Sequence, residues 1–393
     1  MTVNWDAIGR KARKAPLPAK VALAACVGVF ALSSAIGVAS ALSPVPETPI
    51  PPSSSAFSAA DAAVEVEFEG AAAVPSDGQA EPSSLPGASA SDPFAVAAEA
   101  RAALDCAASS DGLSLFDGSD GASRVLDSGE APDVEAAIAA FADADCSVGF
   151  VVYDLAAQRG LSYNADGMYF CASTVKAPFV SYVLQDAVAG GTASLDDEVE
   201  EDLVVEGTGI MSEDDVGSYD LRTVVENTLI HSDNTGYALL RERFGADGFE
   251  AWCERADVDT ATWSGEWYPS CAPRDLAKLW VNIGAFLMGD DPNAQWCQSL
   301  LERTRVSFLR EALGPDRTVL SKPGYEVDIP GYSTAALDDA GLVVDGDGAY
   351  VVAIMSDAGY DDEHFTDNEH LIVDLAAALD AAHDRLLVES EVS

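Results

Sequence analysis

The sequence FCASTVKAPFV, residues 170–180, contains a serine and a lysine spaced by about one turn of a helix. Ser173 is a common type of helix N-cap, and the apolar residues after it continue to the helix-ending pair Gly190–Gly191. Lys176 follows Ser173 by three residues, which places an amine beside the hydroxyl on one helix face. The stretch therefore predicts an apolar helix that begins with a hydroxyl–amine pair.

This pair has the chemistry of an activated nucleophile. A lysine that is partly buried loses some of its preference for the charged form, so Lys176 can accept the proton of Ser173. The N–H groups at a helix start suit a developing oxyanion. Serine and lysine at this spacing are also common on ordinary helix surfaces. Lysine is rare in this chain, since only Lys176, Lys278 and Lys322 occur after residue 20. This scarcity favours a functional role for Lys176 over that of an ordinary surface residue.

Charge limits the classes of partner. The 393-residue chain has 66 acidic and 21 basic residues and a formal net charge of −45, which repels nucleic acid and anionic membrane surfaces. The length allows two domains or one large one. No cysteine pair has C-x-x-C spacing, and no metal or cofactor is expected. We expect a monomer.

The N-terminus has the pattern of an exported protein. Residues 1–20 contain the only cluster of basic residues and are predicted to be cytoplasmic, and the uncharged apolar run 21–42 is long enough to cross a bilayer. We expect a single-pass anchor in the cell membrane with the remaining chain outside. The alternative is a removable signal peptide with its cleavage site near Ala39–Ala41, which gives a secreted protein.

The cysteines fit an oxidising compartment. Of seven cysteines, Cys26 lies in the apolar run, and the other six can form up to three disulfides in fifteen possible pairings. Free buried thiols are the alternative.

The coarse pattern divides the rest of the chain in two. Residues 43–131 are predicted to be a disordered Pro/Ala/Ser-rich stalk and a loop-rich region, and 132–387 a catalytic domain. Helices are expected at 133–141, 221–230, 235–244, 249–255, 273–286, 295–313 and 368–386, and strands at 147–154, 161–164, 319–322, 332–337, 340–344 and 349–355. For residues 93–104 a helix is the alternative, as part of the fold or of the stalk. The predicted class is α/β (α+β), an antiparallel sheet with flanking helices plus an all-helical lobe.

Two further motifs follow Ser173 and Lys176. Ser232-Asp233-Asn234 lies between two predicted helices, and Lys322-Pro323-Gly324 lies on a predicted strand. Asp233 alone would be read as a helix cap. Together, Ser-x-x-Lys, Ser-Asp-Asn and Lys-x-Gly in this order resemble the penicillin-recognising serine hydrolases, in particular the class A β-lactamase-like branch.

The resemblance implies a set of roles. Ser173 would attack a carbonyl and become acylated while Lys176 takes its proton, and Ser232, supported by Lys322, would protonate the leaving nitrogen. Asn234 would bind the substrate amide. The backbone N–H groups of Ser173 and of Tyr325, directly after Gly324, would form the oxyanion hole. The expected reaction is cleavage of a β-lactam or a peptidoglycan-type amide through an acyl-serine.

The chain departs from the family pattern in two places. No glutamate of the loop before Pro273 has an Asn four residues on, and Glu266 is the best substitute for the glutamate that activates water for deacylation. Pro323 replaces the usual Thr or Ser, and no arginine follows Lys322 before Arg385, so recognition of a substrate carboxylate is altered. A D,D-peptidase or esterase and a non-catalytic envelope-binding module therefore stay as alternative functions.

Overall fold

The structure is a computed structural model that describes residues 92–109, 112–211, 217–261, 265–328, 331–346, 348–360 and 368–388. The predicted cytoplasmic segment 1–20, the anchor 21–42 and the stalk up to residue 91 lie outside these ranges. No helix within them is both long and apolar enough to span a membrane.

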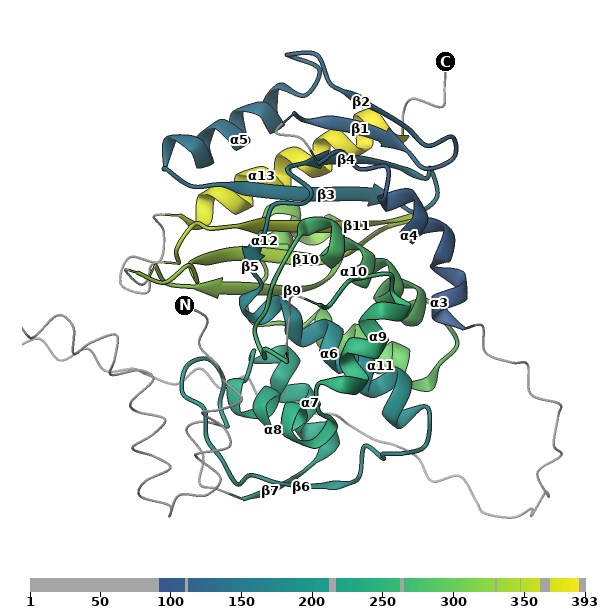
Figure 1. Ribbon diagram of the computed structural model, residues 1–393, viewed down its shortest axis with the longest axis vertical. Coiled ribbons are helices and arrows are strands. Elements are labelled where there is room, and N and C mark those ends of the chain that lie inside the picture. Colours follow the sequence, from purple (N-terminus) through teal and green to yellow (C-terminus); the bar gives the residue numbers. More distant parts are fainter. Residues whose placement is uncertain are drawn as a thin grey trace, which may run out of the picture. The chain divides into compact units, whose positions relative to one another are not determined.

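The main element is an antiparallel sheet of seven strands with the order β2-β1-β4-β3-β11-β10-β9 (Figure 1). Two short two-stranded ladders, β5–β8 and β6–β7, lie outside it. The strands are β1 Ser114–Asp117, β2 Ala122–Val125, β3 Val148–Asp154, β4 Arg159–Tyr163, β5 Tyr169–Phe170, β6 Glu198–Glu200, β7 Ser218–Asp220, β8 Ser270–Cys271, β9 Thr318–Glu326, β10 Ala336–Asp345 and β11 Gly348–Ser356.

Helices cover the sheet and form a separate lobe (Figure 1). They are α3 Pro93–Val96, α4 Ala98–Leu104, α5 Pro132–Asp143, α6 Lys176–Tyr182, α7 Leu221–Ile230, α8 Asn234–Phe244, α9 Asp247–Arg255, α10 Pro273–Leu287, α11 Pro292–Leu301, α12 Phe308–Leu313 and α13 Glu369–His383. Short 3₁₀ turns occur at η1 Ala172–Val175 and η3 Gly314–Asp316, and π-helical segments at η2 Val183–Val188 and η4 Asp384–Val388.

The sheet separates two hydrophobic cores. On β3, Phe150 and Val152 face a core shared with α5 and α13, whereas Val151 and Tyr153 face the core of α10 and the helical lobe. This alternation is that of a strand buried on both faces. The predicted class, an antiparallel sheet with flanking helices and an all-helical lobe, is confirmed.

The ordered fold begins earlier than the expected boundary at residue 132. The segment 92–131, expected to be stalk and loop, contains α3, α4 and two strands of the main sheet. Asp105, just after α4, forms an ion pair with Lys278 of α10, and the Arg274 guanidinium bonds to the Leu104 carbonyl. The Gly/Asp/Ser-rich sequence of 111–129 concealed the two strands, because β1 pairs with β4, a strand far along the chain.

Two other expected elements differ. The helix expected at 295–313 is two helices, α11 and α12, because the Ser307 hydroxyl caps α12 by accepting the N–H of Arg310. The Arg310 guanidinium also binds the carbonyls of Glu302 and Thr304 in the intervening loop. The strand expected at 332–337 starts only at Ala336, and β10 then runs without a break to Asp345.

A buried charge pair joins the end of α13 to the end of β3. His383 Nε2 lies 2.8 Å from Asp154 Oδ2, and its Nδ1 lies 3.0 Å from Asp384 Oδ1. Burial alone would lower the pKa of His383, but its bonds to Asp154 and Asp384 outweigh burial and raise it above 6.5. Burial opposes ionisation of Asp154 too, yet hydrogen bonds from His383 and Ala157 lower its pKa below 3.8.

Replacing His383 by glutamine is expected to lower the free energy of unfolding by roughly 3 kcal/mol near pH 5.5, because Asp154 stays buried without its charged partner. The extra stability of the wild type over His383→Gln is complete between the ordinary pKa values of Asp154, 3.8, and His383, 6.5. It is lost as pH rises through the raised pKa of His383 and as pH falls through the lowered pKa of Asp154.

Denaturant unfolding of both proteins at pH 5.5 and pH 9 measures this difference. The control is Asp384→Asn, which removes the half-exposed partner of the same histidine. An equal gap between wild type and His383→Gln at both pH values would contradict the pairing.

Candidate active site

Ser173 lies in the 3₁₀ turn η1, between β5 and α6. It is not the N-cap residue that the sequence predicts, because α6 begins at Lys176 and its N-cap is Val175. Ala172, directly before the serine, has a φ of 41°, in the left-handed region that non-glycine residues adopt at a cost. Among the described residues, none forms a hydrogen bond with the Ser173 hydroxyl, which leaves it available to attack a substrate.

Lys176 is completely buried and strongly hydrogen-bonded. Its amine lies 2.5 Å from the Ser232 carbonyl oxygen, 2.7 Å from Asn234 Oδ1 and 3.3 Å from Ser232 Oγ. A neutral amine has two hydrogens and one lone pair, so it can donate to the two close oxygens and still accept a proton. Burial, reinforced by the charge of Lys322, holds the pKa of Lys176 well below 10.5. This lysine is suited to act as a base.

The Ser232 hydroxyl connects the two buried lysines. Lys322 Nζ lies 3.0 Å from Ser232 Oγ and 2.9 Å from the Pro323 carbonyl oxygen. Burial lowers the pKa of Lys322 to about 7. The two amines thus meet at Ser232 and not at the Ser173 hydroxyl, an arrangement that allows a proton to pass from one lysine through Ser232 to a bound group.

The Ser-Asp-Asn loop also holds the segment 205–211. The Asp233 carboxylate caps α8 through the Gly236 N–H at 2.8 Å and accepts the N–H groups of Ile210 and Met211. Asn234 Oδ1 accepts bonds from Lys176 and from the hydroxyl of Thr208, and its Nδ2 donates to the carbonyl of Glu206. Asn234 therefore orients Lys176, in addition to its predicted role in substrate binding.

Strand β9 passes close to the nucleophile turn at Gly324. A Cβ atom there would lie 2.6 Å from the Cys171 carbonyl oxygen and 3.0 Å from the Ser173 backbone nitrogen. Only glycine allows this approach, which brings the β9 backbone to the N–H group of Ser173. The ring of Tyr325 points to the other face of β9, where it packs against Phe308 and Tyr360. Only the backbone of Tyr325 is left for the predicted oxyanion role.

The loop before α10 brings a tyrosine to Lys176. The Tyr268 hydroxyl lies 3.2 Å from Asn234 Oδ1, and its ring centroid lies 5.9 Å from Lys176 Nζ, as does that of Tyr237. Burial raises the pKa of Tyr268 well above 10, so the phenol stays neutral. Two tyrosine rings therefore lie beside the amine.

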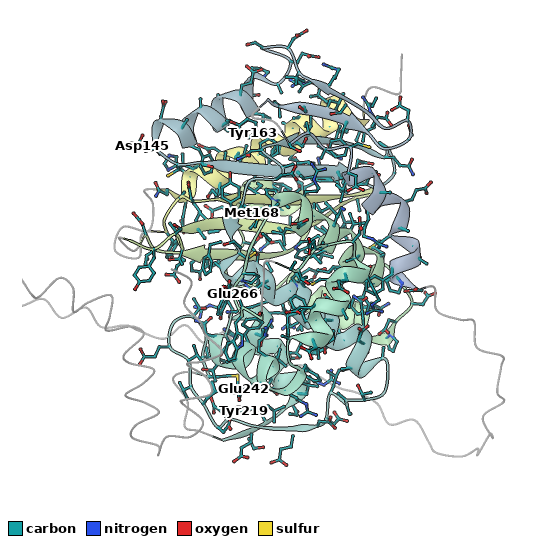
Figure 2. All side chains as sticks on the ribbon, viewed as in Figure 1. Asp145, Tyr163, Met168, Tyr219, Glu242 and Glu266 are labelled. Carbon is teal, nitrogen blue, oxygen red and sulfur yellow. The ribbon has the colours of Figure 1, made fainter. Side chains whose placement is uncertain are left out.

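Glu266, the predicted substitute for the deacylating glutamate, belongs to the same loop. In the view of Figure 2 its label falls between the sheet and the helical lobe. Burial raises its pKa, but its carboxylate forms no hydrogen bond within the described ranges. The group that the loop does bring to Asn234 and Lys176 is Tyr268, two residues further on.

Sequence reasoning missed Tyr268 and Thr208. Tyr268 lies beside Glu266 in a loop rich in aromatic residues, and that was the available signal. Thr208 lies in an acidic stretch with no motif, and its hydroxyl reaches the Ser232 carbonyl oxygen at 2.6 Å. Nothing in the local sequence indicates this contact, because it joins segments about 25 residues apart.

The cysteines differ from the expected disulfides. All six cysteines after the apolar N-terminal run are free thiols in this structure. Cys171 and Cys271 are nevertheless close together, with their sulfur atoms 2.8 Å apart.

Comparison with known proteins identifies the family. The model of the beta-lactamase enzyme family matches residues 133–383, which is more than half of the chain. The chain belongs to this family. Membership agrees with the order of the Ser-x-x-Lys, Ser-Asp-Asn and Lys-x-Gly motifs and with their meeting in one site. No curated protein sequence matches the chain significantly.

Solved structures share the fold at low sequence identity. The structure of PBP-A is 22% identical, with a TM-score of 0.54 over 65% of this chain and 96% of that one. A beta-lactamase from Chitinophaga pinensis is 22% identical, with a TM-score of 0.55 over 64% and 99%. One from Sphaerobacter thermophilus is also 22% identical, with a TM-score of 0.53 over 64% and 97%. At this identity the likeness establishes the fold alone.

Proposed function

We propose that the protein is an exported serine hydrolase that cleaves a β-lactam or a peptidoglycan-type amide through an acyl-serine. The observation that carries this proposal is the Ser232 hydroxyl, 3.3 Å from the Lys176 amine and 3.0 Å from the Lys322 amine, beside the turn that holds Ser173. The site has a nucleophile, a base of lowered pKa and a proton relay, which acyl transfer requires. A non-catalytic binding module has no need of two buried lysines.

The acylation step follows from these groups. The Ser173 hydroxyl attacks the substrate carbonyl and gives its proton to neutral Lys176. The proton passes to Ser232 and from there to the leaving nitrogen, with the charge of Lys322 favouring the transfer. The backbone N–H groups of Ser173 and Tyr325 receive the oxyanion, since Gly324 lets β9 approach the turn.

Deacylation is expected to be slow with β-lactams. The side chain that the loop before α10 brings to Lys176 is Tyr268, and its raised pKa prevents it from acting as a base at neutral pH. This observation favours a penicillin-binding D,D-peptidase as the second candidate. A variant of PBP-A has been captured as an acyl-enzyme with penicillin G. For this chain we propose the same type of intermediate.

Substrate recognition is expected to be unusual. Pro323 has neither a hydroxyl nor an N–H for a substrate carboxylate, and its carbonyl oxygen is bound by Lys322. Glu326, which shares the β9 face of Lys322 and Gly324, has a pKa raised by burial. Pro323 therefore offers a substrate carboxylate no hydrogen-bond donor.

A chromogenic cephalosporin mixed with a known concentration of protein tests the function. We expect a burst of about one product molecule per protein, followed by turnover at least about 10²-fold slower, because acylation outpaces deacylation. Ser173→Ala should give no burst.

The later course of the reaction separates the candidates. Fast sustained turnover would contradict slow deacylation and assign a β-lactamase. Neither burst nor turnover, together with no release of D-alanine from a D-alanyl-D-alanine peptide, would contradict the proposed function.

The place of the protein at the cell membrane is part of the proposal. We propose that residues 21–42 anchor the chain with the catalytic domain outside, where peptidoglycan lies. The basic residues before the apolar run support this orientation.

A further inference from the structure

Cys171 and Cys271 occupy adjacent positions across the ladder β5–β8. Cys271 pairs with Tyr169, and the Cys171 N–H donates to the Pro269 carbonyl oxygen at 2.9 Å, so the ladder reaches as far as Cys171. Both side chains are almost fully buried. Their sulfur atoms lie 2.8 Å apart, less than about 1 Å beyond the length of a disulfide bond. Among the described cysteines this is the only contact between two cysteine sulfur atoms, and Cys271 Sγ also lies 3.9 Å from Met355 Sδ.

This cysteine pair borders the nucleophile turn. The Cys171 carbonyl oxygen accepts the backbone N–H of Thr174 at 2.9 Å and its hydroxyl at 2.6 Å, closing the turn around Ser173. Gly324 of β9 packs on the same carbonyl. Ala172, between the cysteine and the serine, keeps a positive φ only because its surroundings impose it. A cross-link at Cys171 would hold the first residue of this strained turn.

We propose that Cys171 and Cys271 form a disulfide that fixes the turn of Ser173 to the segment leading into α10. The two thiols lose two electrons and two protons, two S–H bonds break and one S–S bond forms. The oxidant is the disulfide of an oxidoreductase or of glutathione, which is reduced to thiols.

The surroundings of the pair indicate when the bond forms. The contact with Cys171 and burial raise the pKa of Cys271 well above 9, so its thiolate is scarce in the folded protein. Because thiol–disulfide exchange needs a thiolate, the disulfide forms during folding and resists reduction afterwards. The cross-link stands on this geometry alone. Its effect on acylation rests on the function proposed above.

Peptide mapping of the full chain, folded in a glutathione redox buffer, tests the cross-link. Free thiols are alkylated and the protein is digested without reductant. We expect one linked peptide pair containing Cys171 and Cys271, lighter by two hydrogens than the separate peptides and absent after treatment with dithiothreitol. Alkylation of both cysteines in the folded protein would overturn the proposal.

Matched variants make the assignment specific. Cys171→Ser should abolish the linked pair, whereas Cys253→Ser, an equally buried cysteine of α9, should leave it intact. A link from Cys271 to any other cysteine in the wild type would also overturn the proposal.

Two further measurements, of Tm and of the acylation rate, show the effect of the disulfide. Reduction of the wild type under denaturing conditions, followed by refolding with reductant, should lower Tm by about 5 °C or more. Well below Tm, the reduced protein should acylate several-fold more slowly. A linked pair in a protein that no β-lactam or peptide acylates would leave the disulfide established and refute the proposed function.

Discussion

Replacing Lys176 by methionine is expected to slow acylation of Ser173 by about 10³-fold, because the base that accepts the serine proton is lost. Methionine keeps much of the buried volume, so the apolar surroundings of the side chain stay filled. The acceptors Ser232 and Asn234 lose their shared donor, which lowers stability as well. The acylation rate is therefore measured well below the Tm of the variant, by intact mass at several times of exposure to a penicillin.

Lys278→Met is the matched control. Lys278 is a third buried lysine of the described chain, but it pairs with Asp105 and Asp257, away from the site. Its loss should reduce stability and leave the acylation rate of the folded protein within about threefold of the wild type. Equal acylation rates for wild type and Lys176→Met would rule out this lysine as the base.

The pH profile of acylation in the wild type is a second test of the roles proposed for Lys176 and Lys322. The rate should rise with pH as Lys176 loses its proton, at a pH well below 10.5. It should fall as Lys322, with a pKa of about 7, loses the charge that favours proton transfer to the leaving nitrogen. Because the amines share Ser232, the two limbs report the pair and not each lysine separately.

Replacing Gly324 by valine is expected to lower the acylation rate by at least about 10²-fold, the effect of losing an oxyanion donor. The added Cβ would meet the Cys171 oxygen at 2.6 Å, the Thr174 nitrogen at 2.9 Å and the Ser173 nitrogen at 3.0 Å. These are backbone atoms of a hydrogen-bonded turn, so β9 must move away from it. The measurement is the second-order rate of acylation by a penicillin.

Gly284→Ala in α10 is the control for Gly324. Its added Cβ would lie no closer than 3.4 Å to Leu342, an ordinary contact, and alanine favours the helix. This variant should acylate at the wild-type rate. Normal acylation by Gly324→Val would show that β9 does not complete the oxyanion site.

Local patterns in the sequence predicted most of the helices and the sheet class. The segments 221–230 and 249–255 have helical spacing with apolar positions on one face, and they are α7 and the second part of α9. The failures lie where distant contacts override local pattern. The run 295–313 looks continuous, but Ser307 starts a new helix there, and β1 and β2 pair in the main sheet although their sequence resembles a loop.

The residues of the candidate site also fall into those that the sequence predicted and those that it did not. Ser173, Lys176, Ser232 and Lys322 were predicted by spacing and order, and the structure places the amines of Lys176 and Lys322 at the Ser232 hydroxyl, beside the turn that holds Ser173. The two tyrosine rings beside Lys176 were not predicted, because Tyr237 and Tyr268 approach it through the tertiary fold. Six cysteines can pair in fifteen ways, and the sequence does not favour any of them. The register of β5 and β8 is what shows that Cys171 lies next to Cys271.

The most direct test of the central claim is the position of the covalent adduct formed with penicillin G. The protein is mixed with penicillin G, quenched and digested, and the peptide that carries the penicilloyl mass is sequenced by tandem mass spectrometry. The account predicts one adduct, on Ser173, that persists for minutes or longer and is absent from Ser173→Ala. An adduct on another residue, or its presence in Ser173→Ala, would contradict the assignment of Ser173 as the nucleophile.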